Sequence, residues 1–122
     1  MSDDKMKEWL QNLMNCDACK LRHEGNRGPT RYSGDPASPL MFVGEGPGGV
    51  EDEYGVPLVG PSGQLLDKAL WSVGLTRDHV YVTNIVKCRP PRNRDPQFAE
   101  QKCCSEWLQR QIELVDPVLI VC

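Results

Sequence analysis

The stretch VYVTNIV at residues 80–86 decides the fold of this 122-residue chain. Its β-branched residues and near-continuous apolar character predict a buried strand. A second short apolar run at residues 40–43 ends in Gly44 and predicts another strand, and residues 118–121 predict a third. Strands that are apolar along their whole length are typical of parallel sheets that are covered on both faces.

Three helices are expected around these strands. Residues 3–15 carry apolar side chains at helical spacing, which gives one apolar stripe. A second helix is predicted over residues 63–73 and a third over residues 95–115, where Pro96 takes a favoured first-turn position. Residues 20–38 are rich in Gly, Pro, Arg and Ser and are expected to be irregular. Alternating helices and strands predict an α/β fold with a parallel sheet covered by helices.

The chain stops at Cys122, where the last predicted strand ends and before any helix that would cover it. A parallel strand needs cover on both faces. We therefore expect residues 1–122 to be the N-terminal portion of a single domain whose C-terminal part is absent.

Composition narrows the class of protein. Charged residues make up 25% of the chain and hydrophobic residues 39%, which is ordinary for a soluble globular domain. No apolar run approaches the ~20 residues that a membrane helix needs, and the acidic N-terminus does not have the pattern of a signal peptide. We expect an intracellular protein that has no membrane partner.

The net charge of −3 argues against a broad basic surface for nucleic acid. One local cluster nevertheless gathers four basic residues within eight positions: Lys87, Arg89, Arg92 and Arg94. It is interpreted either as a solvated loop or as a small patch that holds a few phosphates.

Six cysteines are many for such a chain, and without a secretory signal metal or cluster ligation is favoured over disulfides. Cys16 and Cys19 form a C-x-x-C pair, whereas Cys88 and Cys104 lie far along the chain. This spacing suits an iron–sulfur cluster, an irregular zinc site or buried free thiols, and it does not decide among them. Cys103 is expected on a different helix face from Cys104, and Cys122 is expected in the core, so neither is expected to be a ligand.

Ligands of open α/β sheets bind beyond the carboxyl ends of the strands, and two such ends carry unusual sequence. After the first strand, Gly44, Gly46 and Gly49 formally match the dinucleotide pattern G-x-G-x-x-G. We reject that match because Pro47 stiffens the turn and the acidic residues around it would repel a pyrophosphate. An acidic turn is better suited to a water molecule or a neutral base, unless it is simply the exit from the strand.

Asn84 lies near the end of the strand at residues 80–86, and its amide offers a donor and an acceptor side by side. That pair matches one edge of a pyrimidine. A lone asparagine at a strand end is also a common turn former, so the signal is weak by itself.

Together these motifs resemble the family 4 uracil-DNA glycosylases, iron–sulfur enzymes that remove uracil from DNA. The resemblance rests on the C-x-x-C pair, on MFVGEGPGGVEDEYGVPLVGPSGQLL (41–66), on VYVTNIVKCRPPRNRDP (80–96), and on Cys104 in a helix that ends WLQRQIELVDP (107–117). It implies a three-layer α/β/α sandwich and a role in base-excision repair. It also implies a structural [4Fe–4S] cluster whose ligands are four cysteines: Cys16, Cys19, Cys88 and Cys104.

The resemblance further implies roles for single residues. The turn Gly46-Pro47-Gly48 and the preceding Glu45 would form the base and water side of the pocket. Glu51 is the first choice for orienting the water or stabilising the sugar cation, and Glu45 is the second. Asn84 would read the edge of uracil and reject cytosine. Cytosine exchanges a donor for an acceptor at this edge, so its binding would leave buried groups unpaired at a cost of about 1–3 kcal/mol each.

The same resemblance implies the form of the substrate. A base inside a duplex must be flipped out at a cost of roughly a few kcal/mol. Single-stranded DNA and U·G mismatches are therefore expected to be the easier uracil-containing partners, and the protein is expected to be a monomer.

Two features depart from the family. Leu58 stands where the family usually has an aromatic residue on which uracil stacks, an interaction worth about 1–3 kcal/mol per base. The family's histidine-proline-serine segment has no counterpart, since neither His23 nor His79 lies in one. We expect a complete member to be active and leave the activity of these 122 residues open.

Two other functions stay open at this stage. One is a non-catalytic cysteine–metal module, with zinc or a cluster, that contacts nucleic acid through residues 87–94. The other is a relative in the same superfamily with a different damaged-base specificity, an alternative that Leu58 keeps open.

Overall fold

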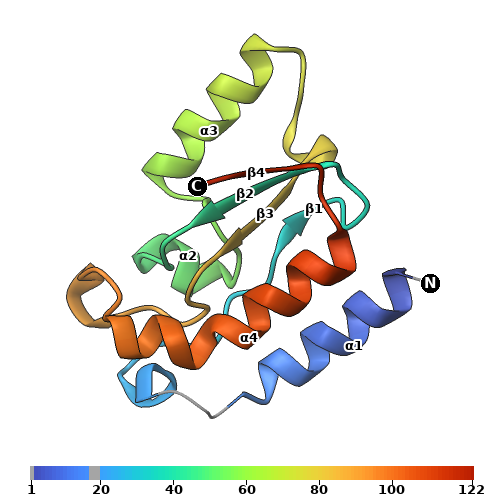
Figure 1. The fold of residues 1–122 in the computed structure, drawn as a ribbon. Helices are drawn as coiled ribbons and strands as arrows, with labels where there is room; N and C mark the ends of the chain where they lie inside the picture. Colours follow the sequence, from blue (N-terminus) through green and yellow to red (C-terminus); the bar gives the residue numbers. More distant parts are fainter. Residues whose placement is uncertain (1, 17–19) are drawn as a thin grey trace.

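The computed structural model describes residues 2–16 and 20–122. Four strands form one sheet in the order β1-β3-β2-β4 (Figure 1). The elements follow one another along the chain as α1 (Ser2–Met14), η1 (Lys20–His23), β1 (Ser33–Gly34), β2 (Leu40–Gly44), α2 (Gly49–Tyr54), α3 (Pro61–Ser72), η2 (Arg77–His79), β3 (Tyr81–Asn84), η3 (Pro91–Asn93), α4 (Phe98–Val115) and β4 (Leu119–Val121).

The sheet is mixed, with a parallel centre. Strand β2 pairs in parallel with both β3 and β4, whereas the two-residue β1 pairs antiparallel with β3. The expected α/β fold is confirmed. Strand β1 was not expected, because it forms inside the stretch 20–38 that has no strand pattern; it is fixed by tertiary contact, including the bond from the Asp35 N–H to the Val80 carbonyl at 2.9 Å.

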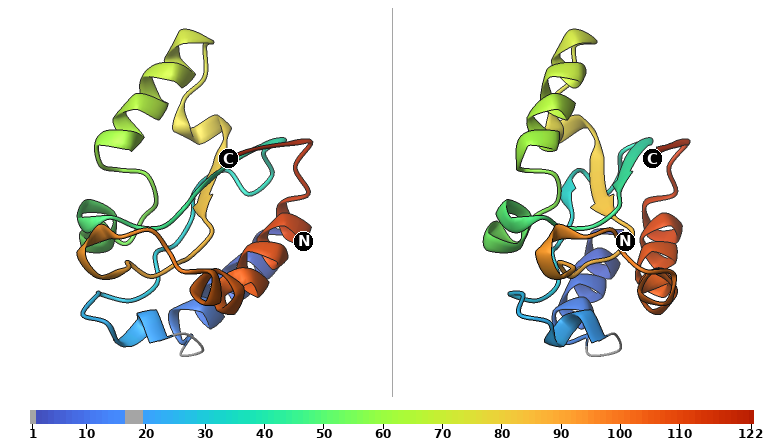
Figure 2. Two further views of the ribbon diagram at one scale, coloured as in Figure 1. Left: turned by 60° about the vertical axis from the view of Figure 1, so that its left-hand side comes forward. Right: turned by 90° about the vertical axis from the view of Figure 1, so that its left-hand side faces the viewer.

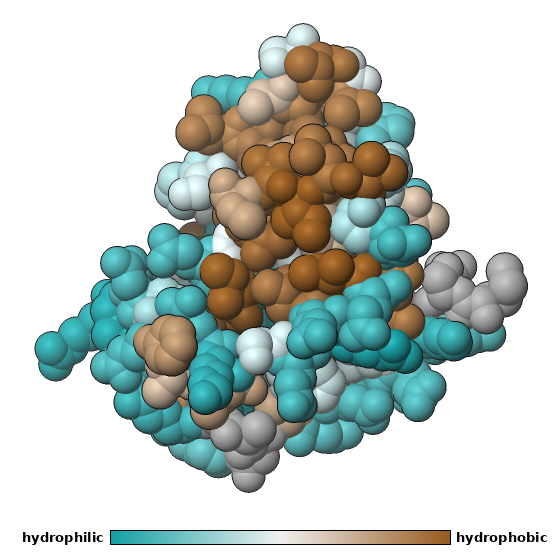
Figure 3. Space-filling model, viewed as in Figure 1, coloured by the Kyte–Doolittle hydropathy of each residue, from teal (hydrophilic) through white to brown (hydrophobic). Residues whose placement is uncertain are grey.

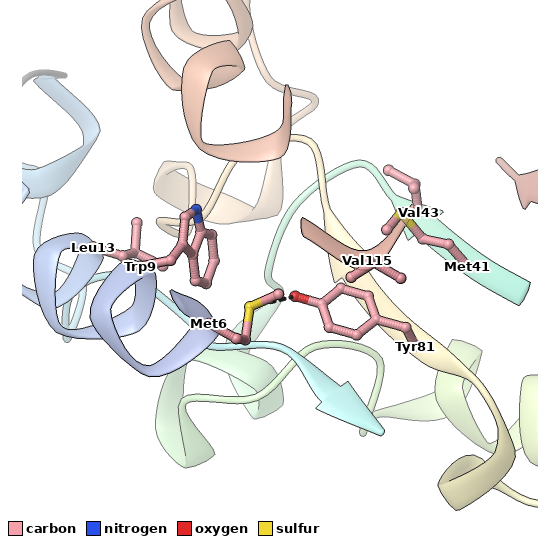
Figure 4. Close-up of a cluster of buried hydrophobic side chains, with 7 residues drawn as sticks. All are labelled: Met6, Trp9, Leu13, Met41, Val43, Tyr81 and Val115. Atoms are coloured by element: carbon pink, nitrogen blue, oxygen red, sulfur yellow. Dashed lines mark hydrogen bonds between the residues drawn. The ribbon is translucent and has the colours of Figure 1, made fainter. Parts of the chain in front are cut away.

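Side chains of the central strands alternate between two cores, one on each face of the sheet. On one face, Met41, Val43 and Tyr81 pack against residues of α1 and α4 (Figure 4). On the other face, Val82 packs with Leu70 of α3. Figure 2 shows the sheet between these two helical layers. The expectation of a three-layer α/β/α arrangement is thus confirmed.

Two helix boundaries differ from the sequence-based expectation. Helix α4 begins at Phe98, three residues later than expected, because the Glu100 carboxylate accepts a hydrogen bond from the Gln97 N–H at 2.8 Å and sets the first turn there. Residues 94 and 97 are extended, so Pro96 precedes the helix and does not occupy its first turn. Helix α2 was not expected, and it continues the acidic turn after β2.

One face of the molecule is apolar and exposed. Figure 3 shows it as a brown area over α3 and β4, above the hydrophilic surface of the lower helices. Its largest exposed side chains are Leu65, Trp71, Val73, Val118, Leu119, Ile120 and Val121. Cys122 is exposed too, so the expectation that it lies in the core is wrong. Within residues 2–16 and 20–122, no helix is long and apolar enough to cross a membrane.

Candidate functional site

The carboxyl ends of β2 and β3 lie side by side. The parallel register pairs Gly44 with Asn84. Backbone pairing continues beyond the strands, because the Ile85 N–H donates to the Gly44 carbonyl at 2.8 Å and the Val86 N–H donates to the Glu45 carbonyl at 3.0 Å. The turn after β2 and the loop after β3 are therefore fastened to each other, as expected for a ligand site at this edge of the sheet.

Asn84 is the most unusual polar residue at this edge. Asn84 is 2% exposed, and neither its Oδ1 nor its Nδ2 has a hydrogen-bond partner in the described part of the chain. A buried amide without partners costs about 1–3 kcal/mol per group, and such groups in folded proteins need an explanation. A donor and an acceptor held together without partners fit a ligand edge that presents the complementary pair.

Gly44 makes room for the Asn84 amide. A Cβ atom at position 44 would lie 2.5 Å from Asn84 Oδ1, so a side chain there would displace the amide. It would also lie 3.7 Å from Leu58 Cδ2. Gly44 is therefore the point at which the strand end, the asparagine amide and Leu58 meet.

Leu58 is held in an uncommon backbone conformation. Its φ is +52°, in the left-handed region that side-chain-bearing residues seldom adopt. Its carbonyl accepts a hydrogen bond from Arg77 Nη2, and Arg77 Nε also pairs with Asp67 Oδ1 at 2.6 Å. Its side chain packs at the margin of the core cluster that contains Leu70. Arg77 and this packing together fix the position of Leu58.

Glu51 joins two segments of the site through its carboxylate. Oε1 accepts from the Gly48 N–H at 3.0 Å, and Oε2 accepts from the N–H groups of Val59 at 3.0 Å and Gly60 at 2.6 Å. Both oxygens are thus occupied by backbone donors from the turn after β2 and from the loop that carries Leu58. Sequence reasoning missed this role because it depends on two segments that only the fold brings together.

Glu45 lies differently. Its side chain is exposed and lines a cleft of about 150 Å³ between residues 45–48 and residues 90–96. Gly46, Pro47 and Gly48 line the same cleft, whereas Asn84 and Leu58 are not among its lining residues. The structure therefore brings the acidic turn to a cleft that Asn84 does not line, and it leaves the Asn84 amide closed from solvent.

The four basic residues of the loop after β3 have different environments. Arg92 is exposed, and Arg89 is half-buried with its Nε donating to Asn93 Oδ1 at 2.8 Å. Both line a hollow of about 350 Å³ that shares Pro90 with the cleft. Arg94 instead makes two 2.7 Å bonds to the Glu100 carboxylate. That hydrogen bonding lowers the pKa of Glu100 to about 2 and raises the pKa of Arg94.

Lys87 does not meet the expectation of a DNA contact. It is 1% exposed and its Nζ is surrounded by internal acceptors. Burial lowers the pKa of Lys87 from its ordinary 10.5 to about 7. Basic residues that are neighbours in sequence need not point the same way. The Lys87 side chain follows the buried strand β3 and points into the core, so it is not on the basic surface.

Three of the four expected cysteine ligands lie around one cavity. Cys16 follows α1, Cys88 follows β3 and Cys104 lies on α4, and all three line this cavity with Leu21 and Trp107. Exposed Cys103 borders it as well, and Cys19 lies outside the described residues. Among the described residues, no group of three metal-binding side chains is close enough to hold a single metal ion.

Comparisons of the sequence with a family profile and with single proteins agree on one superfamily. The sequence profile of the uracil DNA glycosylase superfamily matches residues 32–122. The chain is 41% identical over 119 residues to a type-4 uracil-DNA glycosylase of Archaeoglobus fulgidus, an alignment that covers 98% of this chain and 59% of that protein. Type-4 uracil-DNA glycosylases of Sulfurisphaera tokodaii and Thermotoga maritima are 43% and 42% identical over 97% and 98% of this chain, and over 54% and 62% of their own lengths. The chain thus spans little more than half the length of these relatives.

The Glu51 contacts predict a loss of stability on substitution. Glu51→Gln leaves one acceptor oxygen for three N–H donors, so we expect a loss of roughly 1–3 kcal/mol in unfolding free energy, measured by urea unfolding followed by circular dichroism. Glu53→Gln, an exposed change on the same helix, is the matched control and should stay within about 0.5 kcal/mol of wild type. Equal stability of the two variants would contradict the role of Glu51 in joining the two segments.

Proposed function

Because the chain belongs to the uracil DNA glycosylase superfamily, we propose that it forms the base-binding part of a DNA-repair enzyme that hydrolyses the N-glycosidic bond of uracil in DNA. The observation that carries this proposal is the buried, unpartnered amide of Asn84 at the carboxyl end of β3. The type-4 uracil-DNA glycosylases to which the chain is similar support it.

Asn84 selects the base in this proposal. Uracil presents an N–H donor beside a carbonyl acceptor, and the amide offers the complementary acceptor and donor. Cytosine exchanges the donor and acceptor, so it would leave the amide buried without partners. Since the amide is closed from solvent in the described structure, entry of the base requires neighbouring atoms to move, and Leu58, whose side chain also lies beside Gly44, is the proposed one.

Glu45 is the better candidate for orienting the attacking water, and Glu51 the better candidate for holding the pocket together. Bond cleavage leaves positive charge on the sugar and negative charge on uracil, so a carboxylate near the sugar stabilises the transition state. The Glu51 oxygens already accept three backbone hydrogen bonds, whereas the Glu45 side chain faces the cleft. We therefore reverse the order of the two residues expected from the sequence, with Gly46-Pro47-Gly48 forming the wall of the cleft.

Phosphate contacts fall to Arg89 and Arg92, which line the hollow next to the cleft. Arg94 is engaged by Glu100 and Lys87 is buried, so neither is assigned to DNA. Two guanidinium groups hold few phosphates.

A target base must leave the stack to enter the pocket, and this costs least in a single strand or at a mismatch. Single-stranded DNA and U·G mismatches are therefore the proposed substrates. The protein is proposed to act on them as a monomer in the cytoplasm.

A [4Fe–4S] cluster is the proposed cofactor, held by Cys16, Cys88 and Cys104 together with Cys19. Cysteines that share one cavity without converging on a single point fit a cluster of four irons better than one zinc ion, because the cluster spreads its ligands farther apart. Its role when bound is structural. Its ligands come from the end of α1, the loop after β3 and α4, and they would tie these three segments to one another.

Uracil release tests the function. The chain, purified without air, is expected to release uracil from a single strand and from a U·G duplex, and Asn84→Ala should slow release at least about tenfold, since each unpaired group costs about 1–3 kcal/mol and about 1.4 kcal/mol is tenfold in rate. Asn12→Ala on the surface of α1 is the matched control. Equal rates for the two variants contradict the assignment of Asn84. Uracil-selective binding without release supports the base pocket and contradicts the hydrolytic step in this chain.

The assignment of Glu45 makes a separate prediction. Glu45→Gln should lower the rate of release by about 10²-fold or more, as expected for a group that handles the attacking water. Its affinity for uracil-containing DNA and its stability should stay close to wild type. Glu53→Gln is the control here as well. Full activity of Glu45→Gln would return Glu51 to first place.

Metal analysis tests the cofactor. We expect about four irons and four labile sulfides per chain. Cys104→Ser should lose iron, whereas the neighbouring change Cys103→Ser should retain it. Zinc without sulfide in the wild-type protein would contradict the cluster and favour the cysteine–zinc module that the sequence left open.

A further inference from the structure

A buried lysine separates the base-reading residue from a cysteine of the proposed cluster. Lys87 is three positions after Asn84 and directly precedes Cys88. It is 1% exposed, although lysine is almost never fully buried without partners. Its backbone carbonyl is fixed as well, since it accepts from the N–H of Thr30 at 2.7 Å and from the Thr30 hydroxyl at 3.0 Å.

The three donor positions of the Lys87 ammonium are all used. Nζ donates to Thr83 Oγ1 at 2.9 Å, to Gln111 Oε1 at 2.6 Å and to the backbone carbonyl of Asn84. An ammonium has three N–H groups, so the side chain has no donor to spare. Lys87 therefore binds the end of β3 and a buried residue of α4 at the same time.

Gln111 completes a network in which each polar atom has a consistent role. Its Oε1 also accepts from the Thr83 hydroxyl at 2.9 Å, and its Nε2 donates to the Tyr81 hydroxyl at 2.7 Å. Thr83, Gln111 and Tyr81 are each at most 1% exposed. A fully satisfied buried network of this kind favours one arrangement of the groups that it joins.

This network ends at the peptide whose side chain is left without partners. The Asn84 carbonyl is held by Lys87, while the Asn84 amide lies next to Gly44 and has no partner within residues 2–16 and 20–122. Fixing the carbonyl fixes the orientation of the peptide and therefore the direction in which the side chain leaves it. The Lys87 ammonium does not itself take part in the pocket, since none of its donors is available to a ligand.

We propose that Lys87 is a positioning residue that aims the Asn84 amide at the base, and that through it helix α4 sets the selectivity of the pocket for uracil over cytosine. The proposal rests on the proposed role of Asn84. Loss of the ammonium leaves the Asn84 carbonyl buried without a donor and allows its peptide to turn, so the amide no longer matches one base edge better than the other. A purely structural lysine would lower stability without changing that choice.

Lys87→Met tests this, because methionine fills similar volume without a donor. The probes are two single-stranded oligonucleotides with one 2′-fluoro-deoxyuridine or one 2′-fluoro-deoxycytidine, since fluorine at that position slows cleavage and allows binding to be measured by fluorescence anisotropy. We expect the ratio of uracil to cytosine affinity to fall roughly tenfold in Lys87→Met, with affinity for the cytosine strand unchanged. Thr83→Val, a smaller change in the same network, should shift the ratio in the same direction by about threefold and serves if Lys87→Met does not fold.

The matched control is Val115→Ala, which removes buried volume from α4 one turn after Gln111. It should lower the melting temperature and keep the wild-type ratio. A ratio that stays at the wild-type value in Lys87→Met, or in Thr83→Val where the first variant does not fold, overturns the proposal. The proposal is also overturned if the ratio of uracil to cytosine affinity falls as far in Val115→Ala as in Lys87→Met.

Hydrogen exchange separates failure of this proposal from failure of the proposed function. If wild-type protein shows no preference for uracil, the base-reading role of Asn84 fails, and the geometric claim is still tested by the amides of Ile85 and Val86, which pair with the turn after β2. Lys87→Met should speed their exchange by more than tenfold relative to Val115→Ala. Equal exchange in the two variants overturns the claim that Lys87 holds this strand end.

Discussion

The parallel register that sets Gly44 opposite Asn84 is the constraint on which the rest of the site depends. A shift of one residue in a strand turns every side chain to the other face of the sheet, so it would send the amide away from the pocket and the core residues of β3 away from their partners. The absence of a side chain at Gly44 then gives the amide its place. The core thus determines the register, and the register determines the site.

Polar groups at this edge of the sheet fall into two kinds. Glu51, Lys87 and Gln111 each have hydrogen-bond partners that join segments distant in sequence, whereas the Asn84 amide has none among the residues that the structure describes. A network that is satisfied rigidifies its surroundings, and an unpaired group in the same surroundings is costly. This contrast is the reason for proposing Asn84 as the group that binds the base.

Sequence patterns predicted the parts of the fold that local chemistry determines. The three parallel strands and α1 followed from apolar periodicity, and Asn84 followed from its place at a strand end. Strand β1 and the role of Glu51 could not be predicted, because both depend on contacts between segments that the sequence does not relate. Lys87 was misplaced for a similar reason: a lysine among arginines suggests a basic surface, and only the packing of α4 against β3 reveals the acceptors that draw it inward. A single lysine directly after an apolar strand was the available signal.

In the function proposed here, the charge arrangement requires that recognition come from the base and not from the DNA backbone. The chain is acidic overall, and of the four basic residues after β3, one is buried and one is neutralised by Glu100. Affinity for the DNA backbone grows with the number of phosphates that are neutralised, so two guanidinium groups give a weak and sequence-independent hold. On this proposal discrimination is supplied in the pocket, where the Asn84 amide, which has no partner in the described part of the chain, gains its hydrogen bonds only from the right base. If the chain reads uracil as proposed, the accuracy with which that amide is aimed therefore matters more than the strength of the hold on DNA.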